Sequence, residues 1–391
     1  MSGASRPAES SPRPGRRLVF RLTCLGFGAV ALVTGLYGGL WRLGWPLPNG
    51  MPLGELHGTL MICGVFGALI ALERAVAIGA AWPYAAPVLS AMGSTALLAG
   101  LPPVLGAVCF TAAAVVLAAA SLTVVLRHAA LFTITMLLGA LALLAGNLVW
   151  MLDGTASRAA GLWLAFLVLT IAGERLELSR VLPPKAGSTA LYALALLLLV
   201  AGGGLGMLSA AGPALFGTGL LACAVWLFRH DIARRTVRQP GQIRYAALCM
   251  LLGYAWLVIA GAISVSLSFS WAQGIWGYDA LLHAVALGFV LSMALGHAAV
   301  IAPALTGFRI VFLRAMYLPL FLLHASVGMR VLGDVLAEEG IRRISGATTV
   351  AALLAFALCI LAGSLRGGAA SGSAVHARPK PPAWTGFSPR R

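Results

Sequence analysis

Long apolar runs alternate along this chain with short segments that hold nearly all of its charge. Most of the runs approach the roughly 20 residues that an α-helix needs to cross a bilayer. Because backbone amides in lipid must be satisfied within their own segment, runs of this length indicate helices and not strands. With 60% hydrophobic and 10% charged residues, the chain has more apolar surface than a water-soluble fold can bury. The sequence therefore predicts an all-α, polytopic integral membrane protein whose immediate partner is the lipid bilayer.

The apolar runs divide the chain into about twelve predicted transmembrane helices with short connections. The predicted spans cover residues 18–40, 55–78, 83–101, 104–126, 130–151, 160–180, 187–209, 213–229, 244–268, 279–304, 313–333 and 344–366. They form one transmembrane domain, 18–366, between a disordered basic tail at 1–17 and a disordered tail at 367–391. The second tail is rich in Gly, Pro and Ser and has too little apolar material to bury.

The net charge of +16 is distributed in a way that favours a particular topology. If the amino terminus is cytoplasmic, the twelve spans place 22 of the 27 Lys and Arg residues on the inside. The positive-inside rule then predicts that both termini are cytoplasmic. The basic residues are scattered through the loops and form no surface between aromatic residues, which argues against nucleic acid as a partner. The six cysteines fall inside apolar runs without a close pair, so we expect neither a disulfide framework nor a CxxC metal site.

Four histidines in apolar runs are the first candidates for function, because ionisable side chains are costly inside a bilayer. His57 and His283 lie near the outer ends of the second and tenth predicted spans, and His297 near the inner end of the tenth. His324 lies near mid-depth in the eleventh span. Taken singly, each is explained by a hydrogen bond to a neighbouring carbonyl or hydroxyl group. As a group, His57, His283 and His324 also suit a haem or copper site toward the outer face. Both readings stay open on the residues alone.

The tenth predicted span separates its two histidines too far for one metal ion. His283 and His297 are 14 residues apart, which corresponds to about 21 Å along a helix. Small residues recur every four positions between them, at Ala284, Gly288, Ser292 and Gly296. Such a stripe admits either a neighbouring helix or a flat macrocycle. The GxxxG pair of Gly35 and Gly39 in the first span predicts close helix packing.

Charged residues at the inner ends of two spans predict interfacial ion pairs. Glu73 precedes Arg74, and Glu174 precedes Arg175, so neighbouring pairs explain both motifs. The arginines are alternatively suited to haem propionates. Asp, Glu and Lys are absent from the middle of every predicted span, which weakens a proton-coupled transporter as an interpretation.

Four stretches of the sequence resemble the NnrS family of twelve-span bacterial membrane proteins. They are HGTLMICGVFGALI in the second span, IAGERLELSR at the end of the sixth, RRTVRQPGQIRYAALCMLLGYAWLVIAG through the ninth, and HAVALGFVLSMALGH in the tenth. Their order and spacing extend the resemblance from about residue 55 to 335. The chain departs from the family's pattern in ERAVAIG, which ends the second span, and in Ala298–Ala302.

The resemblance implies an inner-membrane protein with haem b, and also copper, associated with nitric oxide and nitrosative stress. His57, His283 and His297 match the family's histidine positions and are thereby implied as metal ligands, and His324 stays a further candidate from its depth. Arg175, Tyr254 and Trp256 also match and are implied as cofactor-binding residues.

Other classes of function remain open at this level. Twelve spans are also common among secondary transporters and exporters of small solutes, and an assembly protein with merely packed histidines would look similar. The catalytic subunit of haem-copper oxidases is a poor match, because the sixth and seventh spans contain no histidine. Whether the chain is an enzyme, and which redox partner it has, does not follow from these residues.

Overall fold

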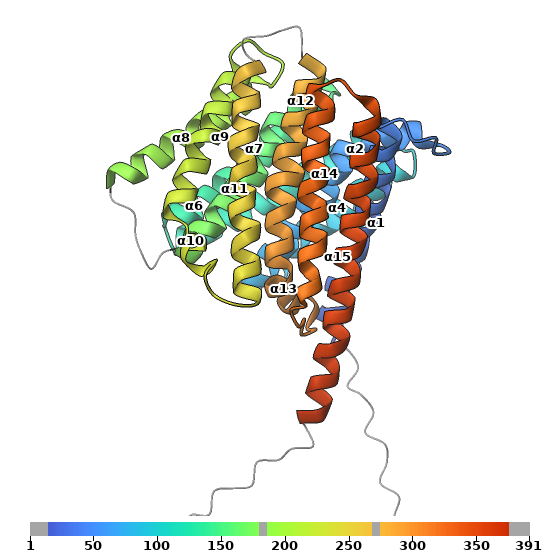
Figure 1. Ribbon diagram of the computed structural model, residues 1–391, viewed down its shortest axis with the longest axis vertical. Helices are drawn as coiled ribbons and strands as arrows, with labels where there is room; N and C mark the ends of the chain where they lie inside the picture. The colour runs from blue at the N-terminus through green and yellow to red at the C-terminus, as the bar shows by residue number, and fades with distance from the viewer. Residues whose placement is uncertain (1–14, 180–185, 268–273, 375–391) are drawn as a thin grey trace, which may run out of the picture.

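The computed structural model describes residues 15–179, 186–267 and 274–374, and these form one helical bundle (Figure 1). The described residues contain no β-strand. Eleven helical segments among them are long and apolar enough to cross a membrane. The prediction of an all-α polytopic membrane protein is confirmed. Of the two tails predicted to be disordered, 1–17 and 367–391, residues 16–17 and 367–374 are helical, and residues 1–14 and 375–391 lie outside the described residues.

The helices follow one another with short connections. In chain order they are α1 (Arg16–Arg42), α2 (Gly50–Thr59), η1 (Leu60–Gly67), α3 (Ala68–Ile78), η2 (Trp82–Tyr84), α4 (Ala85–Leu98), α5 (Pro103–Arg127), α6 (Leu131–Asp153), α7 (Ala156–Ser179), α8 (Ala186–Leu205), α9 (Gly212–His230), α10 (Ala233–Thr236), α11 (Gln242–Leu267), α12 (Gly274–His283), η4 (Ala284–Leu291), α13 (Ser292–Thr306), η5 (Arg314–Met316), α14 (Tyr317–Val335) and α15 (Glu339–Ala374). The α2–η1–α3 and α12–η4–α13 series each form one continuous span. α15 continues past the predicted end at residue 366 and projects beyond the other helices (Figure 1).

The third predicted span, 83–101, is shorter than expected. Its helix α4 has 14 residues, which at 1.5 Å per residue is about 21 Å, less than the roughly 30 Å of a hydrocarbon core. Gly100 adopts φ +70°, and Pro102 follows it, so the chain leaves the helix before the apolar run ends. Eleven long helices and one short helix therefore take the place of twelve equal spans.

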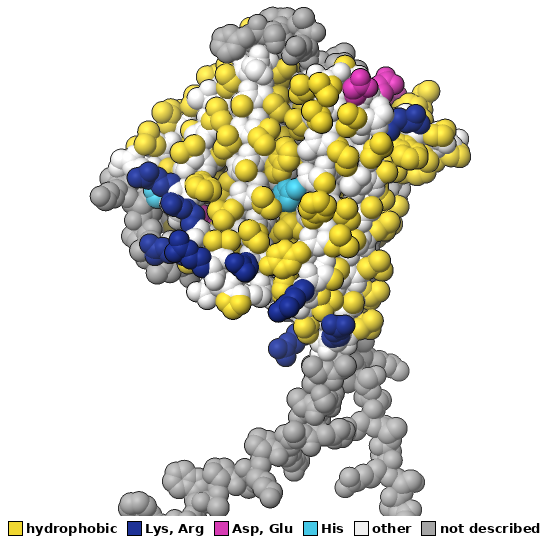
Figure 2. Space-filling model, viewed as in Figure 1, with side chains coloured by type: hydrophobic (Ala, Val, Ile, Leu, Met, Phe, Trp, Pro, Cys, Tyr) yellow, Lys and Arg dark blue, Asp and Glu magenta, His cyan; other side chains and the backbone are white. Residues whose placement is uncertain are grey.

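The start of α1 and the end of α15 lie on the same side of the bundle. Arg21, near the start of α1, donates hydrogen bonds to the Tyr84 hydroxyl at 3.0 Å and to the carbonyl oxygen of Ala304 at 3.3 Å. The amide of Val311, just after α13, donates to the carbonyl oxygen of Gly363 in α15 at 3.1 Å. Because the described chain starts and ends on one side, it crosses the bundle an even number of times. This agrees with α4 serving as a short twelfth crossing. We call this side the basic end, because most arginines visible in Figure 2 lie toward it.

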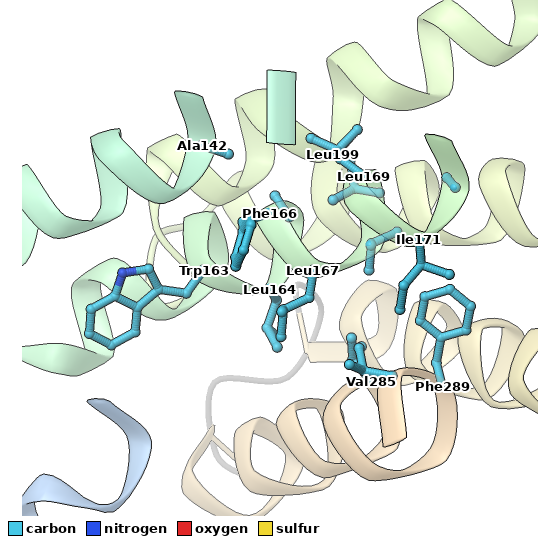
Figure 3. Packing of buried hydrophobic residues seen from close by; sticks show 14 of the residues in the cluster. Ala142, Trp163, Leu164, Phe166, Leu167, Leu169, Ile171, Leu199, Val285 and Phe289 are labelled. Carbon is cyan, nitrogen blue, oxygen red and sulfur yellow. The ribbon is translucent and has the colours of Figure 1, made fainter. Parts of the chain in front are cut away.

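Helix α7 lies at the centre of the bundle, and its neighbours surround it. It is apolar on all sides over residues 159–172, as expected of a helix that faces protein in every direction. Its side chains Trp163, Phe166 and Leu167 pack among residues of α6, α8 and η4 (Figure 3). α1 and α15 are the least buried spans, and their apolar side chains face outward, where lipid replaces protein. The bundle thus holds any polar group between α7 and the outer helices in a low-dielectric setting.

Candidate functional site

His57 is held on α2 by the glycine pair of α1. Its Nδ1 atom lies 2.7 Å from the carbonyl oxygen of Gly35. A Cβ atom at Gly39 would lie 2.8 Å from Cε1 of His57, so glycine leaves the space that the imidazole occupies. Because a carbonyl oxygen only accepts, Nδ1 carries the proton and Nε2 keeps its lone pair. The predicted packing role of Gly35 and Gly39 therefore includes seating the imidazole of His57.

His283 ends α12 with the same hydrogen-bonding pattern. Its Nδ1 atom lies 2.9 Å from the carbonyl oxygen of Asp279 and 3.3 Å from the Oδ1 atom of that residue. Both groups accept, so Nδ1 donates and Nε2 again keeps its lone pair. A carboxylate behind the Nδ1 proton is a frequent partner of metal-binding histidines, because it fixes the tautomer and increases the basicity of the ligand.

The imidazole rings of His57 and His283 are neighbours in the structure. Their ring centres are 6.4 Å apart and their planes differ by 16°. Two imidazoles that share a metal, with bonds of about 2 Å each, have ring centres roughly 6 Å apart. Within the described residues, no group of three or more His, Cys, Asp and Glu side chains is arranged to hold a metal. Two imidazoles are the kind of donor set that haem iron or a two-coordinate copper ion uses.

A buried cluster of four charges lies behind His283. Arg330 binds Oδ2 of Asp279 through Nη2 at 2.6 Å and Nε at 2.8 Å, and Arg342 approaches the same oxygen at 3.4 Å. Arg342 also donates from Nε to Oδ1 of Asp334 at 2.5 Å. The side chain of Asp334 is 0% exposed, and the other three are at most 18% exposed. Two positive and two negative charges balance, which is the condition for keeping ions in such a place. We call these four residues the Asp279 ion cluster.

Each histidine of the pair lies within three residues of the start of a π-helical segment. η1 begins at Leu60, three residues after His57, and η4 begins at Ala284, next to His283. π-helical turns are rare and occur often at functional sites, because the widened turn redirects the side chains that flank it. The two segments thus mark the same level of the bundle from both sides of the histidine pair.

His324 does not join the pair, because both of its ring nitrogens have other partners. Trp256 donates from Nε1 to Nδ1 of His324 at 2.9 Å. The proton therefore lies on Nε2, which is 3.3 Å from the Ser292 hydroxyl, and that hydroxyl donates to the Cys249 carbonyl oxygen at 2.8 Å. Trp256, which the resemblance implies as a cofactor-binding residue, uses its indole nitrogen for this hydrogen bond to His324.

His297 lies toward the basic end, in a network centred on Arg175. Arg175 donates from Nη1 to Nε2 of His297 at 3.2 Å and binds both carboxylate oxygens of Asp231, at 2.7 and 2.8 Å. The Tyr254 hydroxyl donates to the same carboxylate. Because arginine only donates, Nε2 of His297 is an acceptor, and Nδ1 bonds the backbone of Met293. Both nitrogens of His297 are engaged, and the residue is separate from the His57–His283 pair.

Asp231 fixes the connection between α9 and α10 to the bundle. Besides Arg175 and Tyr254, its carboxylate accepts the amide of Ala233 at 2.6 Å. Burial alone would raise the pKa of Asp231, but the hydrogen bonds and the charge of Arg175 outweigh it, so the pKa lies below its ordinary value. The side chain therefore stays a carboxylate and holds Arg175 in place.

The small-residue stripe of the tenth span accommodates a helix. A Cβ atom at Gly288 would lie 2.4 Å from Cγ of Trp256, and one at Gly296 would lie 2.9 Å from Cβ of Cys249. Both contacts belong to α11, so the structure selects the neighbouring helix over the macrocycle at this stripe. A haem held by the histidine pair therefore has to lie elsewhere than along the stripe.

A second polar cluster lies in the core near η1. Asn147 accepts from the Cys63 thiol at 3.3 Å and from Trp163 Nε1 at 2.9 Å, and it donates to the Phe110 carbonyl oxygen at 2.9 Å. Beside it is a cavity with room for about one water molecule. All six cysteines are free in the structure.

The neighbouring ion pairs predicted at the inner ends of the spans are corrected by the structure. Arg175 turns to Asp231 instead of Glu174, and Arg74 donates from Nη2 to the Met136 sulfur at 2.8 Å. Asp231 lies 56 positions from Arg175, so sequence spacing gives no sign of their contact. Asp279 was also missed, although its place four residues before His283 on one helix would have identified it as a partner.

Comparison with known families gives one match over most of the chain. A sequence model described as Domain of unknown function (DUF8744) matches residues 21–365. That range includes all four candidate histidines and the ion cluster behind His283. Comparison with the curated proteins finds no match.

Proposed function

The chain belongs to the DUF8744 family, and we propose that it is an NnrS-like haem protein of the bacterial inner membrane that binds nitric oxide under nitrosative stress. The observation that carries the proposal is the His57–His283 pair, with its ring centres 6.4 Å apart. Each Nδ1 proton is directed at a fixed acceptor, so each Nε2 lone pair would be left for a metal.

The residues around the pair would do three things for haem b. Gly35 and Asp279 would orient the two imidazoles through their acceptor oxygens. The apolar helices around them would limit water, and the Asp279 ion cluster would hold α12 and α14 together behind His283. Bound iron with a displaceable ligand would supply the position for a diatomic molecule. Two imidazoles also suit copper, so the proposal includes copper as the other metal for this pair.

The charge distribution supports a cytoplasmic basic end. Both the start of α1 and the end of α15 lie on that side, together with the arginine-rich connection that includes Arg234, Arg235 and Arg238. By the positive-inside rule this side faces the cytoplasm. The His57–His283 pair then lies toward the outer face, where nitric oxide arriving from outside would meet it first.

An absorption spectrum of the oxidised and reduced protein, purified in mild detergent with haem supplied during expression, tests the proposal. Iron and copper are quantified on the same sample. We expect a Soret band with about one iron per chain, altered in His57→Ala and in His283→Ala, and preserved in the matched variants His297→Ala and His324→Ala. Normal spectra in both pair variants, or a colourless and metal-free wild type, would reject it.

A specific observation keeps a small-solute transporter as the second candidate. Buried ionic networks lie at both ends of one continuous span, at Asp279 near its start and at His297–Arg175 near its end. Networks of this kind at opposite ends of a span suit alternating gates, and η4 between them gives the span an irregular turn. Solute uptake into vesicles by a protein without metal would favour this function over the haem protein.

A further inference from the structure

The two paired histidines have acceptors of different strength behind their Nδ1 protons. His57 donates to the carbonyl oxygen of Gly35, which is uncharged. His283 is within reach of both the carbonyl oxygen and the carboxylate of Asp279. An ionised acceptor draws the Nδ1 proton more strongly and makes Nε2 a better donor to a metal. On hydrogen bonding alone, His283 is the stronger ligand of the two.

The carboxylate behind His283 is also fixed in place. Arg330 binds it with two nitrogen atoms, at 2.6 and 2.8 Å, and Arg342 links it to Asp334. These groups come from α14 and α15, so two further helices hold the acceptor of a histidine on α12. His57 has no comparable charged support in the described part of the chain, and its acceptor is a single helix carbonyl.

Packing does not distinguish the two histidines. Leu281 of α12 and Ala284 of η4 flank His283 and are 0% exposed. Thr59 and Leu60, which follow His57, are 1% and 0% exposed, and the ring of His57 fills the space beside Gly39. The difference between the two histidines therefore lies in the acceptors behind Nδ1 and in the ion cluster that holds one of them.

From these two differences, in the acceptor and in its charged support, we infer that His283 is the permanent metal ligand and His57 is the exchangeable one, released when a diatomic ligand binds. The inference rests on the proposed function, and it names the position at which the ligand arrives. With a metal bound, Nε2 of His57 would give way to the diatomic ligand and Nε2 of His283 would stay, so one donor would replace another and no electron would be transferred. Asp279 acts in this exchange as a positioning residue.

The histidines are distinguished by removing each side chain and supplying free imidazole. His57→Gly is expected to keep haem at near wild-type stoichiometry with a high-spin spectrum, and added imidazole should restore the low-spin spectrum. His283→Gly is expected to lose most of its haem. Haem retained in His283→Gly but lost from His57→Gly would overturn the assignment of permanent and exchangeable ligand, and it would leave the proposed function intact. A wild type without haem, in a preparation supplied with it, would overturn both this inference and the proposed function.

A second comparison tests the role of Asp279. Asp279→Asn removes the charged acceptor, and we expect the reduction midpoint potential to shift to more positive values, because a weaker donor stabilises the oxidised metal less. Asp334→Asn is the matched control, since it removes a carboxylate of the same ion cluster that does not contact His283. Equal shifts in the two variants, or none in Asp279→Asn, would contradict the assignment. If Asp279→Asn fails to fold, the glycine variants of the two histidines still decide the question.

Discussion

The His57–His283 pair and the His297–Arg175 network use the same side chain in opposite ways. In the pair, acceptors face Nδ1 and leave each Nε2 lone pair without a protein donor among the described residues. In the network, an arginine nitrogen 3.2 Å away occupies the lone pair of His297. Both regions are buried and both contain charge, so burial does not distinguish them. The identity of the neighbouring donor decides which histidine is available to a metal.

The largest expected effect comes from removing the charge partner of Asp231 in the His297–Arg175 network. Arg175→Gln leaves the Asp231 carboxylate buried without its charge partner, which typically costs about 3–5 kcal/mol. We expect a much lower thermal unfolding temperature, measured in detergent, with haem per folded chain unchanged. Arg158→Gln is the matched control, because its ion pair with Asp153 is exposed and contributes about 1 kcal/mol or less. Loss of haem without a loss of stability would instead place Arg175 in the cofactor site.

A smaller effect is expected from crowding the pair itself. Gly39→Ala places a methyl group 2.8 Å from His57 Cε1 and should cost about 1–3 kcal/mol while lowering haem occupancy. Gly58→Ala, one residue from His57, adds the same methyl group where nothing lies within 4 Å. Haem content and thermal stability of the two variants are compared. Equal haem content in both variants would show that the placement of the His57 ring against Gly39 is not needed for haem binding.

A variant of His324 tests whether this histidine is a hydrogen-bonding residue or a metal ligand. His324→Ala removes the acceptor of the Trp256 indole proton, which we expect to cost about 1–3 kcal/mol, because the indole donor is left unsatisfied. Haem stoichiometry and the position of the Soret band should stay as in the wild type. A shifted band would return His324 to the group of ligands, and Trp256 fluorescence checks that the local contact has been lost.

The smallest effect is expected from pH. The pKa of Asp231 is lowered in the folded protein, so its contribution is fully present above the ordinary aspartate value of about 4 and is lost as pH falls below that value. The stability difference between the wild type and Asp231→Asn should therefore stay constant from pH 8 to pH 5 and shrink only in stronger acid. Melting curves across that range measure it. A difference that shrinks already between pH 7 and pH 5 would contradict the ion pair.

Sequence patterns predicted the helices well where length decides the structure. Apolar runs near 20 residues gave eleven of the spans, but the run at 83–101 does not show where Gly100 and Pro102 end the helix. The π-helical turns after His57 and His283 carry no apolar signature, because a widened turn changes the backbone and not the composition. Long-range partners such as Asp231 for Arg175 depend on which helices are adjacent, and spacing along the chain does not contain that information.

The candidate site was predicted in part. His57 and His283 were expected at similar depth, and the structure brings their rings together. His324 was expected near them and instead bonds Trp256, because depth along a helix does not specify the direction of a side chain. Its separation from the pair follows from packing between α11 and α14, which a single sequence does not reveal.

An electron paramagnetic resonance spectrum of the oxidised, haem-loaded protein tests the central claim most directly. The account predicts a low-spin signal of two-imidazole ligation in the wild type, in His297→Ala and in His324→Ala. It predicts conversion to a high-spin signal in His57→Ala, where one imidazole remains. A low-spin signal that survives in both His57→Ala and His283→Ala but disappears in His297→Ala would contradict it and move the metal to the basic end.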